Sequence, residues 1–76
     1  MLKRHNVIRA VLAYAEEKGA IVHAVDTTKG LVLCELPAGD WVTWKYGYVS
    51  EEDRAFFHWG NYRPHKADAV VDFATR

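Results

Sequence analysis

The chain has 76 residues, of which half are hydrophobic and 26% are charged, a composition typical of a folded globular protein. Ten Lys and Arg residues balance ten Asp and Glu residues. This balance disfavours a dedicated nucleic-acid binder, which usually carries a basic excess, and it equally disfavours an acidic mimic of DNA. Cys34 is the only cysteine, so no internal disulfide can form. No apolar run is long enough for a signal peptide or a membrane span. We therefore expect one domain, residues 1–76, in the cytoplasm of the producing cell or of a host cell.

The first predicted element is an amphipathic helix. Apolar residues recur at helical spacing and form one stripe, made of Val7, Ile8, Val11, Leu12 and Ala15. Asn6 is a fitting N-cap, because its side-chain oxygen can accept a hydrogen bond from a free amide of the first turn. Gly19 can take the left-handed conformation that ends a helix.

Three strands are predicted next, over residues 20–26, 31–36 and 41–46, because these stretches are rich in β-branched and aromatic residues. The loops between them end in Gly30 and Gly39, which suit positions of positive φ in tight hairpins. These three strands should form an antiparallel meander.

The second half of the chain predicts a fourth strand and a second helix. Gly47 is expected to interrupt the third strand, and a polar connection follows over residues 50–54. One helical turn capped by Ser50 is an alternative for this connection. Residues 55–63 then read as a strand that Pro64 stops, and residues 65–76 as a helix. The predicted fold is α+β, with the order α-β-β-β-β-α and both helices on one face of a four-stranded antiparallel sheet.

The stretch 41–62 holds eight of the ten aromatic residues, and strict alternation places them on both faces of the sheet. The face away from the helices is then the candidate partner-binding surface. Its predicted members are Trp41, Lys45, Phe57, Trp59, Asn61 and Arg63. Loops or sheet curvature can cover such a surface. The functional alternative is an interface with a host protein or with a second copy of the chain, since aromatics rimmed by charge are typical of binding hot spots.

Catalytic and metal-binding signatures are absent from the sequence. The metal-ligand types His23, Cys34, His58 and His65 show none of the spacings of zinc sites. A Cys34–His58 nucleophile pair has no third residue to orient the imidazole. The carboxylates of the stretch 51–53 are best explained as a solvated loop. We therefore expect no metal, no cofactor and no enzymatic activity.

Single-stranded nucleic acid is the alternative ligand. An aromatic sheet face can stack unpaired bases, and this chain could supply such a face from Trp41, Lys45, Phe57, Trp59 and Arg63. The net charge of zero weakens this alternative.

Three short patterns in residues 41–76 resemble short uncharacterised proteins of bacteria, their phages and their mobile elements. The patterns are Val42-Thr43-Trp44, then Trp59-Gly60-Asn61-Tyr62, then Ala69, Asp72, Phe73 and Arg76. His often stands in those proteins where Asn61 stands here, so no role for that position is implied. The resemblance does not extend to the first helix.

The resemblance implies a cytoplasmic accessory protein, encoded by a phage or plasmid and acting on a host protein. Anti-CRISPR and anti-restriction proteins belong to this size class. The leading hypothesis from the sequence is a non-catalytic protein-binding module of this kind. Single-stranded nucleic-acid binding and a self-associating structural protein are the alternatives.

Overall fold

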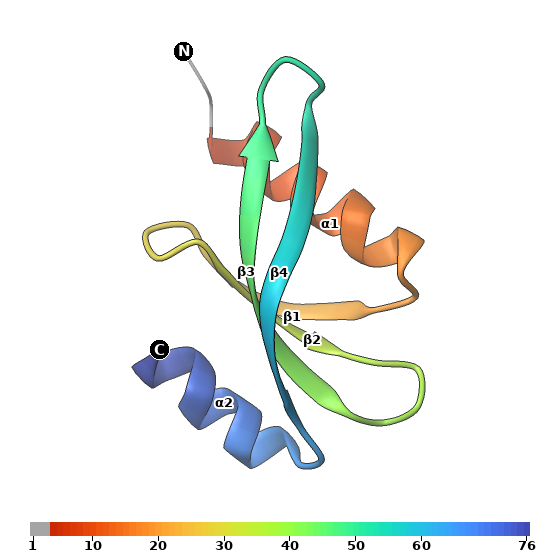
Figure 1. The fold of residues 1–76 in the computed structure, drawn as a ribbon, viewed down its shortest axis with the longest axis vertical. Coiled ribbons are helices and arrows are strands. Elements are labelled where there is room, and N and C mark those ends of the chain that lie inside the picture. Colours follow the sequence, from red (N-terminus) through yellow and green to blue (C-terminus); the bar gives the residue numbers. More distant parts are fainter. Residues whose placement is uncertain (1–3) are drawn as a thin grey trace.

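A computed structural model of the chain describes residues 4–76, and its element order matches the predicted order (Figure 1). The elements are α1 (Arg4–Glu17), β1 (Ile21–Asp26), β2 (Leu31–Glu35), β3 (Trp41–Val49), β4 (Arg54–Arg63) and α2 (Lys66–Thr75). The strands form one antiparallel sheet in the order β1-β2-β3-β4. The predicted α+β class and four-stranded meander are therefore confirmed.

The turns and the end of α1 also follow the sequence. Gly30 and Gly39 have positive φ angles of 70° and 98° in the two short hairpins. Gly19, at φ 72°, ends α1. The amide of Ala20 donates to the carbonyl of Ala15 at 2.9 Å, which completes the hydrogen-bond pattern that a left-handed glycine makes available.

Two element boundaries differ from the predictions. The helix α1 already includes Arg4, so Asn6 is not its N-cap; no Gly or Pro precedes Asn6 to stop the helix there. Asn6 Oδ1 instead accepts a hydrogen bond from Arg9 at 3.3 Å. Strand β3 continues through Gly47, where the Phe56 ring occupies the space of a side chain: a Cβ at Gly47 would lie 2.2 Å from that ring.

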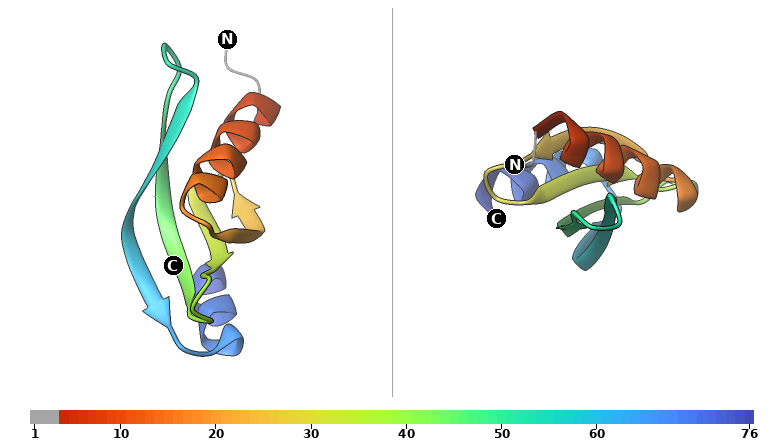
Figure 2. Two further views of the ribbon diagram at one scale, coloured as in Figure 1. Left: turned by 90° about the vertical axis from the view of Figure 1, so that its right-hand side faces the viewer. Right: turned by 90° about the horizontal axis from the view of Figure 1, so that it is seen from above.

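The strands β3 and β4 form a long ribbon, closed by a turn over residues 50–53 (Figure 1). Two hydrogen bonds of 3.2 Å stabilise the turn, from the amide of Glu52 to Val49 and from that of Asp53 to Ser50. Helix α1 lies along the upper half of this ribbon and α2 lies at the lower end of the molecule (Figure 2).

The prediction that both helices pack on one face of the sheet is wrong. The core around α1 contains Val42 and Trp44 of β3. The residue between them, Thr43, points to the other face and its hydroxyl donates to the carbonyl of Ala69 in α2 at 3.4 Å. Since neighbouring residues of a strand face opposite ways, α1 and α2 cover opposite faces. Both faces of β2 are apolar, and the buried Thr43 of β3 lies beneath α2.

The sequence of β2 explains why both of its faces are covered. Val32 and Cys34 belong to the core beneath α1. Leu31 and Leu33 face the other way and are also buried, on the side that α2 covers. An unbroken apolar strand, in place of an alternating one, is typical of a strand that is buried on both faces.

The Cys34 thiol lies fully buried in the core beneath α1, and burial raises its pKa from 9.0 to about 12. A raised pKa means that the folded protein favours the neutral thiol. This preference contributes to the free energy of unfolding in full below pH 9.0. The contribution is lost as the pH rises from there toward 12, because only the thiol of the unfolded chain then ionises.

We predict that Cys34→Ala removes this alkaline sensitivity. Urea unfolding of both proteins should show the stability advantage of the wild type falling by about 1.4 kcal/mol per pH unit above the unfolded pKa. Tyrosine and lysine titrations are common to both proteins and cancel in the difference. Parallel stability curves for the two proteins would show that the thiol does not ionise differently in the two states.

Candidate functional site

Strand β4 contains a β-bulge at Trp59 and Gly60. In the ladder, Lys45 pairs with His58 and Thr43 pairs with Asn61. Trp59 and Gly60 of β4 therefore both stand opposite the single residue Trp44 of β3. Trp59 has a positive φ of 51°. Such a conformation is uncommon for residues other than glycine and is an outlier for a bulky side chain.

The bulge exchanges the two faces of β4. Before it, Phe57 points to the α1 side, where it stacks on Trp44 with ring centroids 5.1 Å apart and receives the edge of Tyr14 at 4.7 Å. After it, Tyr62 points to that side and contacts Trp44 edge-on at 6.0 Å. The prediction that Phe57 shares a face with Trp59 is therefore wrong, because an extra residue shifts the alternation.

Gly60 is required by the close approach of Trp44. A Cβ at Gly60 would lie 2.6 Å from Trp44 Nε1, a separation that no real Cβ contact tolerates. The indole of Trp44, only 8% exposed, thus packs directly on the bulged backbone.

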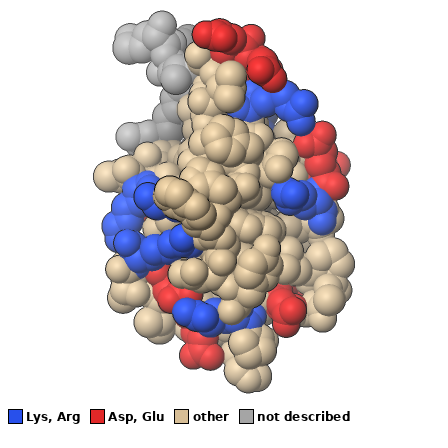
Figure 3. Space-filling model, in the orientation of Figure 1, with Lys and Arg blue, Asp and Glu red and all other residues tan. Residues whose placement is uncertain are grey.

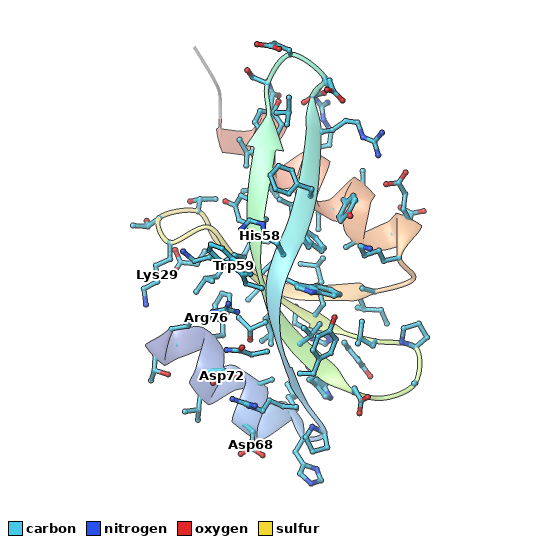
Figure 4. All side chains as sticks on the ribbon, in the orientation of Figure 1. Lys29, His58, Trp59, Asp68, Asp72 and Arg76 are labelled. Atoms are coloured by element: carbon cyan, nitrogen blue, oxygen red, sulfur yellow. The ribbon has the colours of Figure 1, made fainter. Side chains whose placement is uncertain are left out.

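Arg76 ties the bulge to the end of α2. Its guanidinium donates to the carbonyl of Thr43 at 2.7 Å and to the carbonyl of Trp59. These carbonyls belong to adjacent strands, so one side chain joins β3, β4 and α2. Figure 4 shows Arg76 directly beneath Trp59.

Three side chains form a row along β4 on the face that α2 only partly covers. We call Phe56, His58 and Trp59 the aromatic row. Phe56 stacks on His58 with ring centroids 5.5 Å apart, and His58 meets Trp59 edge-on at 4.7 Å. Phe56 is 44% exposed and Trp59 is 71% exposed, the largest exposure of any large hydrophobic residue described. The row is therefore preassembled and accessible.

Three cations lie on the Trp59 side of the molecule, and we call them the cation rim: Lys29, Lys45 and Arg76. Lys45 Nζ lies 6.0 Å from the centroid of the Trp59 ring, within range of a cation–π contact. Lys29 reaches α2 from the β1–β2 turn, and its Nζ donates to the carbonyl of Ala74 at 3.3 Å. Figure 4 shows Lys29, Trp59 and Arg76 on the same side of the molecule.

The other predicted surface residues lie at the opposite end of this face. The Trp41 ring has Lys66 of α2 5.5 Å from its centroid and His23 at 4.6 Å. Arg63 pairs with Asp72 of α2 at 3.1 Å. Asn61 lies opposite Thr43 in the ladder, beside the strand residue that α2 covers. Helix α2 therefore divides the predicted surface, and Trp41 is separated from Trp59.

Four residues of the site were missed by sequence reasoning: Phe56, His58, Lys29 and Arg76. Phe56 and His58 were assigned to the opposite face because strict alternation was assumed through the bulge. Lys29 and Arg76 join the site only through tertiary packing. The one available signal was the sequence Trp59-Gly60, since a glycine inside a strand often marks a bulge.

Other features of the described residues are modest. A pocket of about 170 Å³ lies between α1 and the β3–β4 turn, below the roughly 300 Å³ at which ligand pockets usually begin. Glu17 in its lining lies 3.6 Å from Arg54. Tyr48 donates to Asp53 at 2.6 Å, and this hydrogen bond raises the pKa of the phenol. Within residues 4–76, no group of three metal-ligand side chains gathers, and no helix is long and apolar enough to cross a membrane.

Comparison with protein families, with curated proteins and with solved structures gave no significant match to this chain.

We predict that Arg76→Ala destabilises the protein by about 2 kcal/mol, because hydrogen bonds from a charged donor to two carbonyls are lost. Urea unfolding measures the change. Arg54→Ala is the matched control: its exposed ion pair with Glu17 should contribute less than about 0.5 kcal/mol. Equal effects of the two substitutions would contradict a role for Arg76 as the tie between α2 and the bulge.

Proposed function

We propose that the protein is a non-catalytic binding module that contacts a partner protein through the aromatic row. The observation that carries the proposal is Trp59, a bulky side chain held both in solvent and at a positive φ. Either condition is unfavourable for a bulky apolar side chain. Strained residues that the surrounding structure maintains cluster at binding and active sites.

The energetics support a contact surface of this kind. A Trp side chain buries roughly 150–250 Å² when it enters an interface. With 71% of Trp59 still exposed, covering it would contribute about 3 kcal/mol before the losses of association. Phe56 extends the surface, and its stacking on His58 limits the entropy lost on binding. Trp and its neighbours commonly form the centre of binding hot spots.

Nucleic acid and self-association are the competing interactions for the same residues. An exposed Trp beside cations is also a stacking platform for an unpaired base. Self-association would bury the row against a second copy of the chain. Trp fluorescence quenching by an oligonucleotide at low salt would favour the first, and a concentration-dependent dimer in light scattering would favour the second.

The first experiment compares two exposed aromatics of β4 that lie on opposite faces. Trp59→Gly removes the row's main contact and relieves the positive φ, so its stability should stay within about 1 kcal/mol of the wild type. Tyr62→Ala removes a side chain that is 55% exposed on the α1 side. Thermal unfolding followed by circular dichroism checks that both variants are folded.

Tagged wild type and both variants are then used to capture proteins from a lysate of the producing cell and from host lysates. We expect a partner that is retained by the wild type and by Tyr62→Ala, and is lost with Trp59→Gly. A partner bound equally by all three proteins would place the interface elsewhere.

We further propose that the partner belongs to a bacterial host-defence system. The support is the resemblance of residues 41–76 to proteins of phages and mobile elements. Expressing the chain in bacteria that carry a CRISPR or restriction system should then raise the plating efficiency of a targeted phage. Trp59→Gly should abolish this increase, while Tyr62→Ala should preserve it. Unchanged plating on every such host would exclude defence inhibition while leaving the binding role intact.

A further inference from the structure

No carboxylate of the described residues forms an ion pair with a cation of the rim. Lys29 and Arg76 donate to backbone carbonyls, and Lys45 lies against the Trp59 ring. Each retains free N–H donors, since an ammonium has three and a guanidinium five. The rim can therefore donate to an external anion without first breaking an ion pair.

The rim is also compact. Lys45 stands opposite Leu31 in the β2–β3 ladder, and the amide of Tyr46 donates to the carbonyl of Gly30. These contacts place Lys45 beside the turn that carries Lys29. Figure 3 shows Lys and Arg side chains gathered at the left of the molecule, where Figure 4 has Lys29 and Arg76.

Charge of the opposite sign lies at the far end of the aromatic row. The turn after β3 carries Glu51, Glu52 and Asp53, and all three are exposed. Figure 3 shows this acidic tip at the top of the molecule. The exposed surface therefore runs from a positive end at Trp59, past Phe56, to a negative end at the turn.

We propose that the aromatic row binds an acidic segment of the partner protein. The carboxylates of that segment meet the cation rim, and one apolar side chain of the segment covers Trp59 and Phe56. This inference rests on the proposed binding function and specifies the chemistry of the partner. The argument for it is charge complementarity: Lys45 and Arg76 contact the most exposed aromatic residue, Lys29 reaches the same end of α2 as Arg76, and none of the three forms an ion pair among the described residues.

A protein segment fits this charge pattern better than a nucleic-acid strand. A strand laid along the row would carry one phosphate per nucleotide toward the carboxylates of the acidic tip, where like charges repel. Trp41, which could supply a second stacking position, is separated from Trp59 by α2. A peptide can confine its carboxylates to the rim and present apolar or basic side chains toward the tip.

The probe is a fluorescein-labelled peptide in which glutamates lie on one side of a leucine and uncharged residues lie on the other, and fluorescence anisotropy measures its binding to the full chain. The matched peptide has glutamine in place of every glutamate. We expect the acidic peptide to bind and the neutral peptide to bind at least about tenfold more weakly, with acidic-peptide affinity falling as salt rises.

The variants Lys45→Gln and Lys66→Gln form a matched pair, because each lysine lies over a Trp ring, at 6.0 Å from Trp59 and 5.5 Å from Trp41 respectively. Lys45→Gln should weaken peptide binding about threefold, the size of an exposed charge contact, and Lys66→Gln should leave it unchanged. Combining Lys45→Gln with Lys29→Gln should weaken it about tenfold, because the separate losses add.

Three results would overturn the inference. They are no detectable binding of the acidic peptide, equal binding of the acidic and neutral peptides, and equal losses in Lys45→Gln and Lys66→Gln. Oligothymidylate that binds more tightly than the acidic peptide and displaces it would assign the row to single-stranded nucleic acid instead.

The two proposals fail in different ways. A Trp59-dependent protein partner, together with no binding of the acidic peptide, would leave the binding module intact and overturn only its acidic specificity. Acidic-peptide binding at the rim, together with partner capture that does not depend on Trp59, would overturn the proposed partner interface and leave only the affinity of the rim for acidic peptides.

Discussion

The extra residue in β4 is the constraint on which the rest of the structure depends. It lets Trp44 pack on the backbone of Gly60, and it exchanges the two faces of the strand. Phe57 can therefore join the core beneath α1 while Trp59, two residues later, stands in solvent on the other side. Without the bulge, strict alternation would direct both side chains to one face. Arg76, at the end of α2, stabilises the bulge by donating hydrogen bonds to the carbonyls of Thr43 and Trp59.

The three short sequence patterns of residues 41–76 meet at this place in the fold. Thr43 of the first donates to the carbonyl of Ala69 in the third, and Gly60 of the second packs under Trp44 of the first. Arg76 closes the set through the carbonyls of Thr43 and Trp59. The three patterns thus contain the residues through which α2 contacts the bulged ribbon of β3 and β4. This contact set makes the exposed position of Trp59 reproducible, which a binding surface requires.

Local signals in the sequence were sufficient for much of the fold. The strands, the hairpin glycines Gly30 and Gly39, and the end of α1 at Gly19 follow from short-range chemistry. The alternation within β3 was also predicted correctly. The bulge was missed: its one local signal is Gly60 inside the strand, and the left-handed conformation of Trp59 depends on tertiary contacts. The site residues Lys29 and Arg76 were missed for a related reason: each joins the site only through contacts with distant parts of the chain, Lys29 with the carbonyl of Ala74 and Arg76 with the carbonyls of Thr43 and Trp59.

The burial of Cys34 protects its thiol from oxidation and from disulfide exchange. The only thiol in the chain is fully buried and, with a pKa of about 12, remains protonated at neutral pH. Oxidants and disulfide exchange act on accessible thiolates. The folded chain should therefore form no disulfide through Cys34, either in a reducing solution or in air.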